Sequence, residues 1–168
     1  MNLDELTYKI NGCAMKVHNT LGNGFQEVIY QRCLAIELER AGISFIREQE
    51  HTIYYEGIEV GTRRADFIIE ERVVVELKAV VSLEDVHLAQ AKNYVVAYDK
   101  PIGLLINFGS NSLQFKKVFN PKFNNPEILK SRKLSETGLS GFKDEQDGNN
   151  TKAKILKSNN PLNPDSDK

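Results

Sequence analysis

One stretch, Arg63 to Lys78, constrains the fold of this chain more than any other part of its sequence. Two apolar runs, Phe67 to Ile69 and Val73 to Val75, flank a polar trio of two glutamates and an arginine. Short β-branched and aromatic runs on either side of a polar turn are typical of two antiparallel strands. The sequence therefore predicts a tight β-hairpin here, and with it a sheet.

The predicted hairpin brings three charged side chains together. If the trio forms the turn, Ile69 lies opposite Val73, and counting outward places Asp66 opposite Glu76. Like charges that face each other across a strand pair are unfavourable unless a positive charge lies between them. Lys78 is two residues beyond Glu76 and leaves the same face of its strand. Its ammonium group is one candidate for that positive charge, and a divalent cation is the other.

A purely structural interpretation is that Glu76 and Lys78 form an ordinary surface pair, which contributes little to stability. The surrounding residues argue against it, because Val73 to Val75, Leu77 and Ala79 to Val81 form the nearly continuous apolar run of a strand buried on both faces. Charges without partners are costly in such a strand. We therefore favour a functional site.

The arrangement of Asp66, Glu76 and Lys78 resembles the signature of the PD-(D/E)XK nuclease superfamily, with Ala65 in place of the proline that often precedes the aspartate. The resemblance implies a nuclease that binds Mg²⁺ or Mn²⁺. Hard oxygen ligands suit these ions, and a bound cation acidifies water and stabilises charge on phosphoryl oxygens. Asp66 and Glu76 would be the ligands, and Lys78 would orient or deprotonate the attacking water or stabilise charge on the phosphate.

Further motifs are similar to the GxxExxY protein family, a bacterial and archaeal branch of the same superfamily. They cover about residues 3–120 and comprise H-N-T-L-G-N-G at His18 to Gly24, then Glu27 and Tyr30, R-x-D at Arg64 to Asp66, V-E-L-K-A at Val75 to Ala79, V-H-x-A-Q-x-x-x-Y at Val86 to Tyr94, and G-L-L-I-N-F at Gly103 to Phe108.

The resemblance makes Glu27 a candidate third metal ligand. It also implies that Gln90 and Tyr94 lie beside the active site, where they orient the catalytic lysine or the nucleic-acid backbone. Alternatively, Glu27 is a carboxylate favoured by the helix dipole and Tyr94 is a core residue with Gln90 at its rim. We interpret His18 and His87 as structural, because a lone histidine is more often hydrogen-bonded than a ligand.

Charge limits the choice of partner. The formal net charge is −1, and residues 1–120 carry 13 basic and 16 acidic side chains, so any surface for nucleic acid is local. Arg63 and Arg64 are the candidates for contact with a phosphate, or they balance nearby carboxylates. The expected partner is nucleic acid, DNA or RNA, with DNA favoured. No membrane contact is expected, and the first residues lack a signal-peptide pattern, so we expect a cytoplasmic protein.

Hydrophobic periodicity predicts an α/β fold, an α+β mixed sheet in the order α-α-β-β-β-α-β-β, as in the PD-(D/E)XK nuclease core. The predicted helices and strands are 3–21, 26–41, 45–55, 58–69, 73–80, 85–98, 102–108 and 113–119. Residues 1–120 form the predicted nuclease-like domain. Residues 121–168 hold four of the five prolines and predict a polar, mostly disordered tail.

Two further functions stay open. A catalytically silent module that binds nucleic acid or a protein partner would fit the missing basic excess. A toxin-like or defence factor that acts within a larger assembly would fit low activity of the isolated protein.

Overall fold

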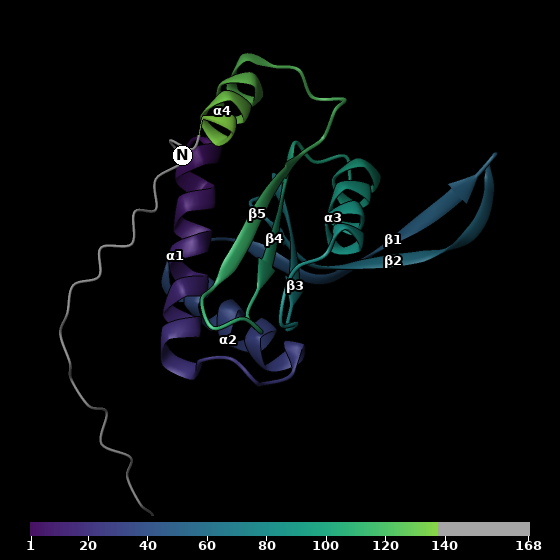
Figure 1. Cartoon of the computed structure of the whole chain (residues 1–168). Helices are drawn as coiled ribbons and strands as arrows, with labels where there is room; N and C mark the ends of the chain where they lie inside the picture. Colours follow the sequence, from purple (N-terminus) through teal and green to yellow (C-terminus); the bar gives the residue numbers. More distant parts are fainter. Residues whose placement is uncertain (138–168) are drawn as a thin grey trace, which may run out of the picture.

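The computed structural model describes residues 1–137 and has a five-stranded mixed sheet with four helices in this part of the chain (Figure 1). The first eight elements follow the predicted order. Their bounds, with those of the last helix, are α1 (Leu3–Leu21), α2 (Glu27–Arg40), β1 (Phe45–Tyr55), β2 (Ile58–Ile69), β3 (Val73–Lys78), α3 (Asp85–Ala97), β4 (Ile102–Asn107), β5 (Gln114–Phe119) and α4 (Pro126–Glu136).

The strands lie in the order β1-β2-β3-β4-β5. Neighbouring strands are antiparallel except for β3 and β4, which are parallel and are joined through α3. A parallel pair needs such a crossover because its second strand must start at the same edge as the first. The mixed sheet predicted from the sequence is therefore confirmed.

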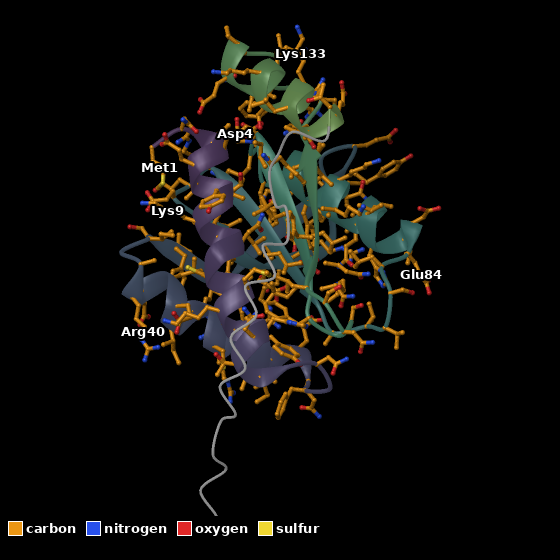
Figure 2. All side chains as sticks on the ribbon, turned by 60° about the vertical axis from the view of Figure 1, so that its left-hand side comes forward. Met1, Asp4, Lys9, Arg40, Glu84 and Lys133 are labelled. Atoms are coloured by element: carbon orange, nitrogen blue, oxygen red, sulfur yellow. The ribbon has the colours of Figure 1, made fainter. Side chains whose placement is uncertain are left out.

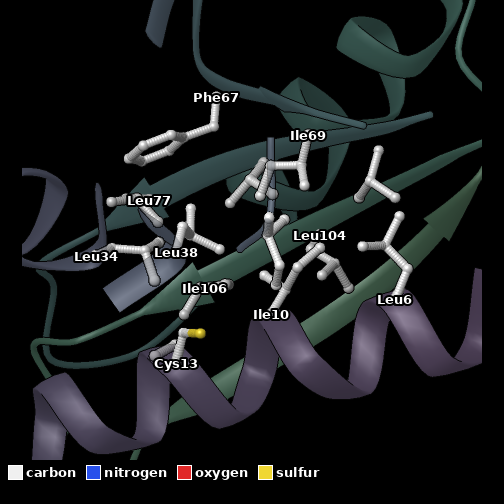
Figure 3. Packing of buried hydrophobic residues seen from close by; sticks show 14 of the residues in the cluster. Leu6, Ile10, Cys13, Leu34, Leu38, Phe67, Ile69, Leu77, Leu104 and Ile106 are labelled. Carbon is white, nitrogen blue, oxygen red and sulfur yellow. The ribbon is translucent and has the colours of Figure 1, made fainter. Parts of the chain in front are cut away.

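Helices cover both faces of the sheet. On one face, α1 and α2 pack Leu6, Ile10 and Leu34 against strand residues such as Leu77 and Ile106 (Figure 3). On the other face, α3 packs against a smaller apolar cluster, whose buried members are Ala65, Ile68, Val74, Ala91, Tyr94, Val95, Tyr98, Leu105 and Val118. Strand β3 is buried on both faces, as its apolar run predicted.

Two glycines in β4 and the turn after it permit close packing. A Cβ on Gly103 would lie 2.6 Å from Val95 and 2.8 Å from Val118. A Cβ on Gly109 would lie 2.4 Å from the backbone nitrogen of Val80, just after β3. The Asn107 side chain also bonds the backbone N–H and C=O of Val80 at 3.0 and 2.8 Å. These contacts hold the segment that follows Lys78.

The β1–β2 hairpin extends beyond the rest of the sheet as an arm (Figure 1). Its strands pair from Phe45 and Ile69 to Tyr55 and Ile58, whereas β2 pairs with β3 only over residues 67–69. The arm is tied to α3 through Tyr98, whose hydroxyl accepts from the backbone N–H of Ala65 at 2.9 Å. The arm therefore has a fixed base and an exposed end.

The segment predicted to be a polar, mostly disordered tail contains a helix near its start, α4, which the sequence did not predict. The Asn125 side chain accepts from the backbone of Ile128 at 2.9 Å, and Pro126 occupies the first turn, where its missing N–H costs nothing. Ile128 is fully buried, and Ser131 donates to Asp4 of α1 at 2.6 Å. Figure 2 shows Asp4 beside α4. The rest of the predicted tail, residues 138–168, lies outside the described residues.

Within residues 1–137, no helix has both the length and the apolar character that crossing a bilayer requires.

Candidate active site

The hairpin between β2 and β3 places Asp66 and Glu76 next to each other. Ile69 pairs with Val73 across a three-residue turn, in which Glu70 and Glu71 have φ of 49° and 54° and the backbone N–H of Arg72 donates to the carbonyl oxygen of Ile69 at 3.0 Å. The β2–β3 ladder ends at the pair of Phe67 and Val75, which directly precedes Asp66 and Glu76. The Asp66 carboxylate atom Oδ2 instead accepts from the backbone N–H of Leu77 at 2.7 Å. The predicted juxtaposition of the two acids is therefore present.

Glu76 is a buried carboxylate with one unsatisfied oxygen. Its Oε1 accepts from Lys78 Nζ at 2.8 Å and from Gln90 Nε2 at 3.0 Å. Its Oε2 is buried without a hydrogen-bond partner. Burial, and then the negative charge of Asp66, raise the pKa of Glu76 to about 7, although Lys78 opposes the shift. A buried oxygen that lacks a donor and lies near a second carboxylate is a suitable ligand for a cation.

Lys78 lies at the centre of a negative cluster. Burial alone would lower the pKa of its ammonium group. The hydrogen bond to Glu76, followed by the charges of Glu76, Glu27 and Asp66, outweighs burial and raises that pKa above its usual value. Lys78 is therefore an ammonium ion at neutral pH in this arrangement.

Asp66 is held by two hydrogen-bond donors that the sequence did not predict. Burial raises the pKa of its carboxyl group, while the backbone N–H of Leu77 and the side chain of Gln31 act in the opposite direction. Gln31 Nε2 donates to Oδ1 at 2.8 Å, and Gln31 Oε1 accepts from Arg47 at 2.9 Å. Gln31 lies one helical turn after Glu27, and that spacing was the available signal.

Glu27 lies at the start of α2, near the two acids. Burial raises the pKa of its carboxyl group, the charge of Lys78 lowers it, and Asp66 raises it further. In residues 1–137, however, no three His, Cys, Asp or Glu side chains are grouped so that they could hold a metal ion. The role of Glu27 as a third ligand stays a prediction, and the ligand pair that the geometry offers is Asp66 and Glu76.

Helix α3 brings Gln90 and Tyr94 to the site. Gln90 Nε2 lies 3.0 Å from Glu76 Oε1 and 3.3 Å from the hydroxyl of Tyr94. Gln90 is therefore in contact with the carboxylate rather than merely at the rim of the core. Tyr94 is 5% exposed and also packs edge-on against Tyr98, so it has a packing role as well.

The two histidines make structural contacts. His87 Nδ1 accepts from the backbone N–H of Glu84 at the start of α3, at 3.0 Å. His18 Nε2 lies 3.0 Å from the carbonyl oxygen of Ser110. These contacts agree with the structural interpretation of both residues.

Arg63 and Arg64 follow each other on β2 and point to opposite sides of the arm, because side chains alternate along a strand. Arg63 lines a groove together with Gln90 and Tyr94. Arg64 lies at the register position opposite Glu50 of β1. The structure therefore brings one of the two arginines, Arg63, to the candidate site.

Comparison with known protein families agrees with this geometry. A family model described as the PD-(D/E)XK nuclease superfamily matches residues 4–118. A search of curated proteins finds no match. A solved structure described as "Crystal structure of SSO0001" is similar at 19% identity with a TM-score of 0.47, and the match covers 66% of this chain and 57% of that chain. The match thus spans less than two thirds of the length of that relative.

Proposed function

Because the chain belongs to the PD-(D/E)XK nuclease superfamily, we propose that it is a metal-dependent nuclease of the GxxExxY branch that hydrolyses phosphodiester bonds in DNA or RNA. DNA is the preferred substrate of the proposal. The observation that carries it is the buried Oε2 of Glu76, which has no hydrogen-bond partner and lies beside a second carboxylate.

Mg²⁺ or Mn²⁺ fits the residues at this site. Asp66 and Glu76 offer hard oxygen atoms, and two carboxylate ligands leave coordination positions for water and a phosphate oxygen. When bound, such an ion supplies acidified water and charge stabilisation at the phosphate.

The protein's own residues then supply position and charge. Lys78, an ammonium ion held 2.8 Å from Glu76, stabilises negative charge that develops on the phosphoryl oxygens. Its raised pKa makes this role more favourable than removal of a proton from water. Gln90 fixes the rotamer of Glu76, and Gln31 fixes that of Asp66.

The test is cleavage of linear, nicked, branched and single-stranded substrates in Mg²⁺ or Mn²⁺. Asp66→Asn and Lys78→Met should abolish cleavage, because they remove a ligand charge and the ammonium group without a large change in volume. Lys9→Met is the matched control, since Lys9 is exposed on α1. Cleavage that persists in Asp66→Asn, or none by the unaltered chain on any substrate, would contradict the proposal.

The alternative is a silent nuclease-fold module that binds nucleic acid or a protein partner. It is favoured by the low positive charge of residues 1–120. Titration calorimetry separates the two functions. Binding of Mn²⁺ that Glu76→Ala abolishes supports the enzyme, whereas nucleic-acid binding that is indifferent to metal supports the module.

A further inference from the structure

A groove lies beside the candidate site, between the β1–β2 arm and α3. Its volume is about 560 Å³. Residues from the arm and from one side of α3 line it, among them Ile53, Arg63, Val86, Ala89, Gln90 and Tyr94. Pockets for small ligands span about 300–1,000 Å³, so the groove has room for a nucleotide-sized group.

The groove is preformed, because Tyr98 joins its two walls. The Tyr98 hydroxyl accepts from Ala65 N–H, donates to the carbonyl oxygen of Gln49, and lies 3.1 Å from the carbonyl oxygen of Arg63. The His51 ring of the arm packs on Tyr98 with a centroid distance of 5.0 Å. These contacts at the base of the arm fix its position relative to α3.

The chemistry of the groove combines an apolar surface with one cation. Val86 is 63% exposed, so α3 presents apolar surface to the groove rather than to the core. The guanidinium group of Arg63 makes no ion pair with any side chain of residues 1–137. Gln90 lines the groove and also contacts Glu76, so the groove is directly adjacent to the candidate metal site.

The apolar surface of the groove suits the face of a nucleic-acid base, and its single cation suits the phosphate next to that base. Bases of a continuous duplex cover their faces by stacking, whereas an unpaired base can place its face on a side chain. A guanidinium group binds the adjoining phosphate by charge-assisted hydrogen bonds.

We propose that this groove binds an unpaired nucleotide next to the phosphate that is cleaved. The inference rests on the proposed nuclease function and narrows its substrate class to nucleic acid with a single-stranded segment, as opposed to continuous duplex. Arg63 contacts the backbone phosphate, and Val86 and Ile53 contact the base.

The test is binding without turnover. Fluorescence anisotropy in EDTA compares a labelled single-stranded oligodeoxynucleotide of about 12 nucleotides with a blunt duplex of the same length. Ala89→Phe fills the groove from an exposed helix position, and Arg63→Gln removes the cation. Each should weaken single-strand binding about tenfold, the equivalent of about 1.4 kcal/mol. Arg32→Gln, an identical charge change at an exposed position of α2 on the other face of the sheet, is the control and should retain the affinity of the unaltered chain.

The results separate this inference from the nuclease proposal. Single-strand binding that depends on Arg63 and Ala89 supports the groove even if no cleavage is found. The inference is overturned if Arg63→Gln and Ala89→Phe bind the single strand with the same affinity as the unaltered chain. A preference for blunt duplex in both binding and cleavage also overturns it, and leaves the nuclease function standing.

Discussion

Replacement of Glu76 by glutamine should change how the stability of the metal-free protein depends on pH. The Glu76 side chain is 7% exposed, and its pKa is raised from 4.5 to about 7 by burial and by Asp66. The folded state therefore holds a proton that the unfolded chain releases at lower pH. Stability contributed by this group is fully present below about pH 4.5 and is lost as the pH rises through about 7.

The size of the effect follows from the same shift. A tenfold change in proton affinity corresponds to about 1.4 kcal/mol, so the whole shift costs the folded protein about 3 kcal/mol. About 2–3 kcal/mol of this loss falls between about pH 5 and about pH 8. Glutamine does not titrate. The free energy of unfolding of Glu76→Gln should therefore rise relative to that of the unaltered chain by about 2–3 kcal/mol over this range.

Urea denaturation in EDTA, followed by circular dichroism at both pH values, measures this difference. Glu39→Gln is the matched control, because Glu39 is exposed on α2. The free energy of unfolding of this variant should differ from that of the unaltered chain by the same amount at both pH values. Mn²⁺ at about 100 times its dissociation constant should then stabilise the unaltered chain by about 2.7 kcal/mol at about pH 8, and Glu76→Gln far less. If the free energies of unfolding of Glu76→Gln and of the unaltered chain changed in parallel with pH, the conclusion that Glu76 is buried beside Asp66 with a raised pKa would be refuted.

Three further outcomes are expected. Gln31→Leu removes the donor to Asp66 and should weaken Mn²⁺ binding about tenfold by calorimetry, while Gln26→Leu, at an exposed position, should not. Gly103→Ala should lower the free energy of unfolding by about 1–3 kcal/mol, because its Cβ overlaps two valine side chains, whereas Gly12→Ala in α1 meets no atom within 4 Å and should be neutral or stabilising. Binding of Mn²⁺ near pH 7 should release a proton, seen as a calorimetric enthalpy that varies with the ionisation enthalpy of the buffer; an enthalpy independent of buffer would show that Glu76 is already ionised.

The sequence predicted the hairpin well because its register depends on local features. Apolar runs of fixed length on both sides of Glu70 and Glu71 leave one pairing that buries them, and that pairing brings Asp66 next to Glu76. The first eight elements were predictable for the same reason. Their boundaries fall at glycines, prolines and polar turns that interrupt a regular hydrophobic pattern.

Features that depend on contacts between distant segments were not predictable. Helix α4 has little apolar periodicity and is stabilised by the burial of Ile128 and by the bond from Ser131 to Asp4, which lies 127 residues away. Gln31 and Arg47 support Asp66 only because the fold brings Gln31 of α2 within hydrogen-bond distance of Asp66 on β2 and of Arg47 on β1. The spacing of Gln31 from Glu27 places both residues on one face of α2, but no short sequence pattern identifies Asp66 and Arg47 as the partners of Gln31.

The electrostatics of the site explain why it needs either a proton or a cation. One ammonium group, Lys78, faces the carboxylates of Asp66, Glu76 and Glu27, whose pKa values are all raised. Burial and, after it, the charge of Asp66 raise the pKa of Glu76 more than the single positive charge of Lys78 lowers it, so Glu76 binds a proton near neutral pH. In the metal-free protein, that proton neutralises the negative charge that a bound cation would otherwise compensate. Metal affinity, the protonation of Glu76 and the stability of the fold are therefore linked, because each depends on the buried negative charge beside the β2–β3 hairpin.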